Sequence, residues 1–129
     1  MAKAVKKRAA RAAKGGPTVL VYVTAPTVRV AERLGGVVVE EGLAACANVL
    51  GPIRSIFRWR GKVERAREAA LILKTRSARV AALTRRIKAL HSYDVPCVVS
   101  LPILGGNADF LAWIDAETRG RDVKRRPKK

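Results

Sequence analysis

Apolar and polar residues in the first third of the chain follow a strand pattern and then a helical one. The uncharged run TVLVYVT at 18–24 predicts a buried central strand. The stretch 27–41 predicts an amphipathic helix whose apolar face carries Val28, Ala31, Leu34 and Val38. Thr27 is the expected N-cap and Gly42 the expected stop. The pair Gly35-Gly36 weakens this helix by about 1 kcal/mol per glycine relative to alanine, so either tertiary packing holds it or another backbone approaches closely there.

The next pattern is that of a long hairpin. Residues 44–60 predict a strand that alternates from Ile53 onward, with Ile53, Ser55, Phe57 and Trp59 on one face and Arg54, Ile56, Arg58 and Arg60 on the other. Gly51-Pro52 interrupts the run and predicts a bulge or an edge position. Arg60-Gly61 predicts a tight reversal, and 62–75 the antiparallel partner, although the propensity of its first part favours a helix.

The last third of the chain adds two helices and a strand. Ser77 is the expected cap of an amphipathic helix at 78–90, followed by a connection at 91–96 and an apolar strand at 97–103. Asn107 is the expected cap of a final helix. The order β-α-β-β-α-β-α predicts an α+β fold, a ferredoxin-like βαββαβ sandwich with an added C-terminal helix. The hairpin, of roughly thirty residues, overhangs so small a domain, which favours a homo-oligomer built by sheet extension.

The net charge of +17 is concentrated at the two ends of the chain. Residues 1–16 hold six Lys or Arg and no acid, and 119–129 hold seven against one acid. We therefore expect one ferredoxin-like domain at 17–119 and two basic, solvated and disordered tails at 1–16 and 120–129. The first tail superficially resembles a transit peptide but has no Ser or Thr. No membrane span is expected, and two cysteines without a secretory signal favour a reducing, cytoplasmic location.

Six sequence motifs in this order resemble the CutA family, the divalent cation tolerance proteins. They are VYVTAP, LAACANVL, IFRWRGKVE, AALILKT, HSYDVP and LPILGGNADFLAWI, and together they span 19–118. The resemblance implies a ferredoxin-like subunit, trimeric through intersubunit β-sheets. It also implies a role in tolerance to copper and other divalent ions, without an established reaction.

By the same resemblance, Cys46 and His91 are candidate metal ligands, and thiolate and imidazole suit copper or zinc. A buried inert thiol at Cys46, and a helix-capping role for His91, are the structural alternatives. The chain departs from the family pattern at Val23, where some members have Cys, and at Ser92 and Asp94. It also has Cys97 where a Glu is usual, which either builds a softer His91/Cys97 pair or removes a carboxylate. Because these residues lack the spacing of a metal motif, we expect any site to be shared between subunits.

The resemblance also suggests an interface cleft, for which the candidates are Trp59, Lys62, Glu64, Tyr93 and Asp94, with Glu68 as a neighbour. The alternative for Trp59 is simple packing, together with Phe57, in the trimer core. For Glu64, Glu68 and Lys74, which share a strand face by parity, the alternative is cross-strand ion pairing.

The sequence contains no catalytic constellation, because its single histidine has no nucleophile elbow or oxyanion donors beside it. We therefore expect a trimeric, non-enzymatic CutA-like protein of divalent metal (copper) tolerance that binds a metal or small ligand at subunit interfaces. The alternative is a nucleic-acid-associated protein that uses its basic tails, with steep salt dependence.

Overall fold

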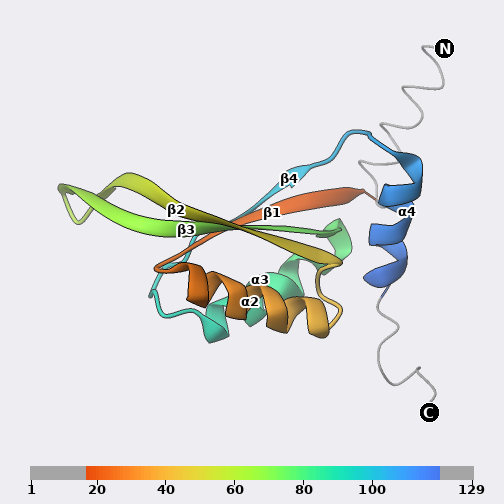
Figure 1. Ribbon diagram of the computed structural model, residues 1–129, viewed down its shortest axis with the longest axis horizontal. Helices are drawn as coiled ribbons and strands as arrows, with labels where there is room; N and C mark the ends of the chain where they lie inside the picture. The colour runs from red at the N-terminus through yellow and green to blue at the C-terminus, as the bar shows by residue number, and fades with distance from the viewer. Residues whose placement is uncertain (1–16, 120–129) are drawn as a thin grey trace.

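The structure, a computed structural model, describes residues 17–119, so the two expected tails lie outside the described residues. The elements follow in the order β1 (Thr18–Ala25), α2 (Val28–Glu40), β2 (Cys46–Trp59), β3 (Lys62–Arg76), α3 (Val80–Leu90), β4 (Val98–Pro102) and α4 (Ala108–Glu117), with a 3-10 turn at Ser77–Arg79 before α3. The helices α2 and α3 lie side by side under one side of the sheet, and α4 lies at the end far from the hairpin tip (Figure 1).

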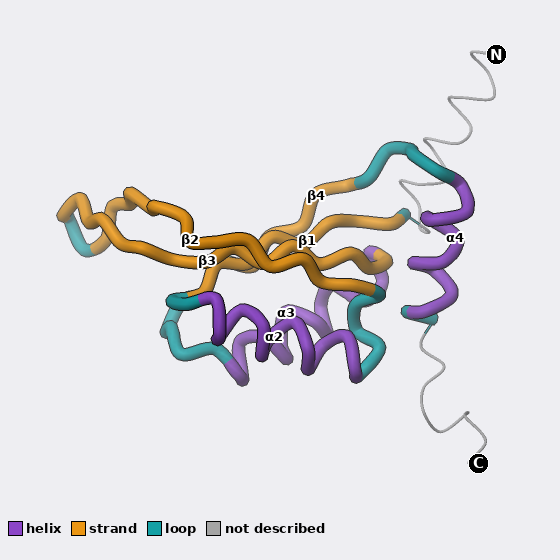
Figure 2. The backbone as a smooth tube through the Cα atoms, in the orientation of Figure 1, coloured by secondary structure: helices purple, strands orange, loops and turns teal. Residues whose placement is uncertain are grey.

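The sheet has the strand order β2-β3-β1-β4, and all three pairings are antiparallel. Consecutive strands β2 and β3 form the hairpin, whereas β1 and β4 are reached through helical crossovers. This is the ferredoxin-like βαββαβ topology with an added helix, as the sequence pattern predicted. The two long strands β2 and β3 run on past the helices as a two-stranded ribbon (Figure 2).

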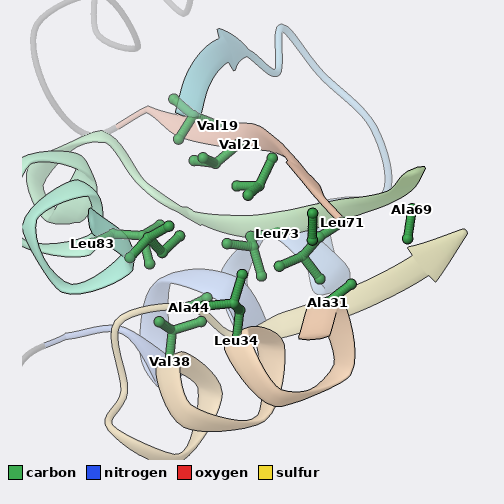
Figure 3. Packing of buried hydrophobic residues seen from close by; sticks show 13 residues of the cluster. Val19, Val21, Ala31, Leu34, Val38, Ala44, Ala69, Leu71, Leu73 and Leu83 are labelled. Carbon is green, nitrogen blue, oxygen red and sulfur yellow. The ribbon is translucent and has the colours of Figure 1, made fainter. Parts of the chain in front are cut away.

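Strand register defines two sides of the sheet. On the helix side, the pairs Val21↔Leu73 and Val23↔Leu71 face α2 and α3, and all four side chains are 0% exposed. This side forms the core, in which Leu34 and Val38 of α2 and Leu83 of α3 meet the strands (Figure 3). The open side carries the alternate residues, among them Tyr22, Ile72, Val99 and Leu101.

Gly35 is explained by the core, and Gly36 is not. A Cβ added at Gly35 would lie 3.0 Å from Cβ of Ala47 and 3.2 Å from Cδ1 of Leu71, so a side chain here would push against β2 and β3, and glycine lets α2 lie close to both strands. A Cβ at Gly36 would meet nothing within 4 Å. Of the two alternatives, tertiary packing is therefore confirmed at Gly35, because the atoms near this position belong to side chains and not to another backbone.

The bulge expected at Gly51-Pro52 is confirmed. The register of β2 against β3 shifts between Leu50 and Ile53, and one extra residue of β2 is accommodated there. Because a shift of one residue exchanges the faces of a strand, Ala47 and Val49 point to the helix side while Ile53, Ser55, Phe57 and Trp59 point to the open side. The hairpin closes at Arg60 and Gly61, whose φ values of 52° and 81° fit a tight two-residue turn.

Two of the three expected helix caps are confirmed. The Thr27 side chain accepts a hydrogen bond from the Val30 N–H at 3.1 Å, and Asn107 accepts one from the Asp109 N–H at 2.9 Å. The cap at Ser77 was wrong, because the Ser77 N–H donates to the Pro17 carbonyl at 2.9 Å and a 3-10 turn intervenes before α3. Among the described residues, no helix is long and apolar enough to cross a bilayer.

Candidate functional site

A cleft of about 700 Å³ opens between the hairpin and the loop that follows α3. Its hairpin wall includes Ser55, Phe57, Trp59 and Glu68, which the bulge and the register of β2 and β3 place on the open side. Its loop wall comprises Tyr93, Asp94, Val95 and Cys97, and Thr24 at the end of β1 lies in its floor. The cleft thus combines aromatic walls with two carboxyl groups.

Tyr93 and Glu68 join the two walls of this cleft. The Tyr93 hydroxyl donates to Glu68 Oε2 at 2.6 Å, a short distance typical of a hydrogen bond to a carboxylate. Burial, and then the hydrogen bond and charge of Glu68, raise the pKa of Tyr93 well above its ordinary value. The phenol therefore stays protonated and acts as a donor throughout the physiological pH range.

His91 fixes the loop wall from behind rather than lining the cleft. Its side chain is buried, with Nε2 at 2.8 Å from the Thr24 carbonyl, while Nδ1 accepts from the Tyr93 N–H at 3.1 Å. Both bonds are satisfied together by a neutral imidazole with its proton on Nε2. The histidine thereby ties the end of α3 to β1 and sets the position of Tyr93, with which its ring also packs at 4.6 Å.

The two cysteines lie in different places. The Cys97 thiol lies in the cleft, 4.0 Å from the Tyr22 carbonyl, and burial together with the negative charge of Glu68 raises its pKa. Cys46 instead borders a groove between α2 and the edge strand β2. Through the register, Cys46 is level with Leu20 of β1 and His91 with Thr24, so the two are separated by roughly 13 Å along the sheet, in addition to the strands between them.

These residues of one chain do not fit a resident metal centre. Both nitrogens of His91 are engaged, the Cys97 thiol is favoured over the thiolate that binds metals, and Cys46 is remote. Within residues 17–119, no group of three His, Cys, Asp or Glu side chains could hold a metal ion. Metal ligation by Cys46, His91 and Cys97 stays a prediction that a second subunit would have to complete.

Three of the five side chains predicted for an intersubunit cleft line this cleft of the single chain. Trp59, Tyr93 and Asp94 line it, whereas Lys62 and Glu64 lie further out, near the hairpin tip, where they face Trp59 and Phe57. The ion pairs within residues 17–119 include none of Glu64, Glu68 and Lys74. Glu68 instead accepts a hydrogen bond from Tyr93, and Lys74 donates one to the Asn48 side chain.

Sequence reasoning missed Ser55 and Thr24 as members of the cleft. The alternation along β2 already placed Ser55 between Ile53 and Phe57, which was a usable signal. Thr24 carried no such signal, because its place in the cleft follows from the pairing of β1 in the middle of the sheet.

Comparison with known proteins decides the family. A protein-family model described as CutA1 divalent ion tolerance protein matches residues 19–117. The chain belongs to the CutA family. It is similar to the rice protein CutA 1, chloroplastic, at 47% identity over 103 residues, covering 80% of this chain and 58% of that protein. It is also similar to the divalent-cation tolerance protein CutA of Archaeoglobus fulgidus at 47% identity over 95 residues, covering 74% and 92%.

Solved CutA structures share the fold. The crystal structure of CutA1 from Oryza sativa superposes with a TM-score of 0.79 at 45% identity, and the match covers 82% of this chain and 97% of that one. The CutA resemblance inferred from six motifs is therefore confirmed. The family description names ion tolerance and no reaction.

Proposed function

We propose that this CutA protein acts in tolerance or response to divalent metal ions, copper among them, as a non-enzymatic homotrimer assembled through the open side of its sheet. The family supplies the role in ion tolerance. The resemblance noted in the sequence supplies the number of subunits. What supports assembly in this chain is the character of the open side.

The open side is apolar without being covered by its own chain. Leu50 of β2 and Val99 and Leu101 of β4 remain 47%, 50% and 49% exposed, at the two opposite edges of the sheet. The helix α4 covers this side only at one end, where Arg76 contacts the Thr118 side chain and carbonyl. A contiguous exposed apolar surface of this kind is typical of a protein interface.

The edges of the sheet point to the same mode of assembly. Strand β2, 14 residues long, and strand β4 are the two edges. An exposed long edge strand is a template for pairing with another chain. We propose that the edges of neighbouring subunits pair, and that Trp59, which is 42% exposed, is covered there.

In such a trimer, the cleft beside Tyr93 and Glu68 lies at a subunit boundary and takes a small ligand or a metal ion. Glu68 and Asp94 supply negative charge and Trp59 an aromatic wall. Direct metal contact would need donors from two chains. For location we propose the cytoplasm, which is supported by the free thiols of Cys46 and Cys97.

The mode of assembly is tested by sedimentation of the wild type and the Val99→Glu/Leu101→Glu variant. Two buried charges would disfavour the interface, so we expect a trimer that becomes a monomer of unchanged circular dichroism. Ser100→Glu/Ser92→Glu is the matched control, with equal added charge at exposed positions off the open side of β4. A monomeric wild type, or an unchanged trimer in the double variant, would contradict this mode of assembly.

Metal contact is tested separately by titrating copper into the trimer and into the Cys46→Ala, His91→Ala and Cys97→Ala variants. We expect at least one variant to lose affinity without losing assembly. Equal stoichiometry and affinity in all four proteins would remove these side chains as ligands and would leave the proposed assembly standing.

A further inference from the structure

The helix-side face of the hairpin ribbon is an arginine surface. Arg54 and Arg67 are directly opposite each other across β2 and β3, and Arg65 follows two positions along, opposite Ile56. Arg58 continues the same face toward the tip, opposite Val63. We call Arg54, Arg65 and Arg67 the arginine face, and all three are exposed.

No acid of the described residues neutralises this face. The ion pairs within 17–119 involve Arg76, Arg86 and Arg119 and none of the three arginines of the face. The two acids of the ribbon, Glu64 and Glu68, project from the opposite side. Like charges directly opposite on neighbouring strands repel each other, and within residues 17–119 no ion pair offsets the repulsion between Arg54 and Arg67.

The arginine face also lies where a large ligand can reach it. It continues the side of the sheet that carries α2 and α3, but the ribbon extends beyond both helices (Figure 1; Figure 2). The assembly proposed above would bury the opposite face of the ribbon and leave this face toward solvent. The inference therefore does not depend on the cleft or on its ligand.

We propose that the arginine face binds the phosphate backbone of double-stranded nucleic acid. Guanidinium groups donate in a fork that matches phosphate oxygens. Arg65 and Arg67 are separated by about 7 Å along their strand, and Arg54 widens the surface across the ribbon. A two-stranded β-ribbon has dimensions that the major groove accepts, and contacts to phosphates alone give binding without sequence preference.

A second copy of this chain is the competing occupant. Exposed acids such as Glu32 and Glu40 on α2 could pair with the arginines in an oligomer. Nucleic acid is favoured because the apolar contact surface lies on the other side of the sheet, with Val99 and Leu101 half exposed there. The test below separates the two, since loss of an intersubunit contact changes sedimentation.

The test measures affinity of the full chain for a duplex DNA of random sequence, by fluorescence anisotropy at several salt concentrations. The face variant carries Arg54→Gln, Arg65→Gln and Arg67→Gln, and leaves Arg58, which also borders the cleft. The control variant removes the same charge from exposed positions of α2 and α3 through Arg29→Gln, Arg33→Gln and Arg85→Gln. Sedimentation of every variant monitors assembly.

We expect the face variant to bind at least about tenfold more weakly at 100 mM salt, with the slope of log K against log salt reduced by about 3. The control variant should keep nearly the wild-type slope, and Arg→Lys at the three face positions should restore most of the affinity. Equal losses in the face and control variants would overturn the proposal, because binding would then follow net charge. Wild-type affinity in the face variant, or a changed oligomer with unchanged affinity per chain, would overturn it as well.

A second measurement needs no variant. A reagent that modifies guanidinium groups is applied with and without duplex DNA, and the extent of modification at each arginine is measured by mass spectrometry. We expect duplex DNA to slow modification at Arg54, Arg65 and Arg67 and not at Arg29 or Arg85. Equal protection at all five arginines would overturn the assignment of this face.

Discussion

The two sides of the sheet differ in what covers them. On the helix side, Val21, Leu71 and Leu73 are fully buried by α2 and α3, whereas on the open side Val99 and Leu101 keep about half of their surface in water. Where the sheet lies over α2 and α3, apolar residues occur on both of its sides. The two sides therefore differ in exposure because helices pack against only one of them. A folded single chain thus completes only one of its two apolar layers.

Beyond the helices the polarity of the two sides diverges. The open side of the ribbon carries the aromatic residues Phe57 and Trp59 beside Glu64 and Lys62, while the helix side becomes basic at Arg54, Arg65 and Arg67. The bulge at Gly51-Pro52 produces this arrangement, because it sets which residues of β2 face which side. The two sides of the ribbon therefore differ in their charged and aromatic residues, and both carry exposed apolar side chains, with Ile56 and Val63 on the helix side.

The largest expected effect separates folding from assembly. Leu71→Ala removes a fully buried core side chain and should lower the free energy of unfolding by about 2–5 kcal/mol. Leu101→Ala removes a side chain that is 49% exposed in the single chain, so it should mainly weaken association. Urea unfolding and sedimentation on dilution measure the two quantities.

The two variants should fail in different assays. We expect Leu71→Ala to stay trimeric below its unfolding transition, and Leu101→Ala to dissociate at a higher protein concentration than the wild type. If Leu101→Ala lost as much unfolding free energy as Leu71→Ala and kept wild-type association, the two sides would not differ as described.

A smaller effect tests how tightly the helix side is packed. Gly35→Val would place methyl groups against Ala47 and Leu71 and should destabilise the fold by about 1–3 kcal/mol. Gly36→Val, one residue along α2, meets open space and should be neutral or slightly stabilising, because valine has a better helix propensity than glycine. Thermal unfolding compares the pair, and equal losses would contradict the close approach at Gly35.

The fold could be predicted because local patterns agreed with one another. The alternation from Ile53, the caps at Thr27 and Asn107, and the interruption at Gly51-Pro52 all reappear in the structure. The cap predicted at Ser77 was wrong because the Ser77 N–H donates to the Pro17 carbonyl, which extends the pairing of β3 with β1. No local sequence signal indicates a hydrogen bond between residues so far apart in the chain.

The site was less predictable, since its geometry depends on pairings between distant segments. Tyr93 and Asp94 could be placed beside Trp59 only by resemblance, and the Tyr93–Glu68 bond joins residues 25 positions apart. The separation of Cys46 from His91 follows from the sheet register, which neither residue encodes.

On the open side, the charge of Glu68 is expected to control the reactivity of the Cys97 thiol. Glu68→Gln removes the charge that contributes to its raised pKa, while an amide oxygen can still accept from Tyr93. The thiolate fraction should rise, so Cys97 should react several-fold faster with iodoacetamide at pH 8. Glu64→Gln is the matched control on the same side of β3, and an equal acceleration there would show a general charge effect.

The smallest expected effect lies on the outer surface of the helix side, where Arg86 of α3 forms an ion pair with Glu41 at the end of α2. Its two guanidinium nitrogens lie 2.8 and 2.7 Å from the carboxylate oxygens. The hydrogen bond from Arg86 lowers the pKa of Glu41 below its ordinary value. A carboxyl group whose pKa is lowered by folding contributes stability above its unfolded pKa of about 4.3, and that contribution disappears as the pH falls through the folded value.

Arg86→Gln should therefore cost a small amount of stability at pH 7, and its difference from the wild type should shrink as the pH falls below about 4. Urea unfolding across that range measures the difference. Arg85→Gln removes a neighbouring exposed charge that forms no ion pair within residues 17–119, and it should show no such pH dependence. A pH-independent loss in Arg86→Gln would assign the contact to packing of the arginine stem against α2 rather than to charge. Because this pair is exposed and joins two helices that the core already holds, its effect should remain below that of any change on the buried face of the same helices.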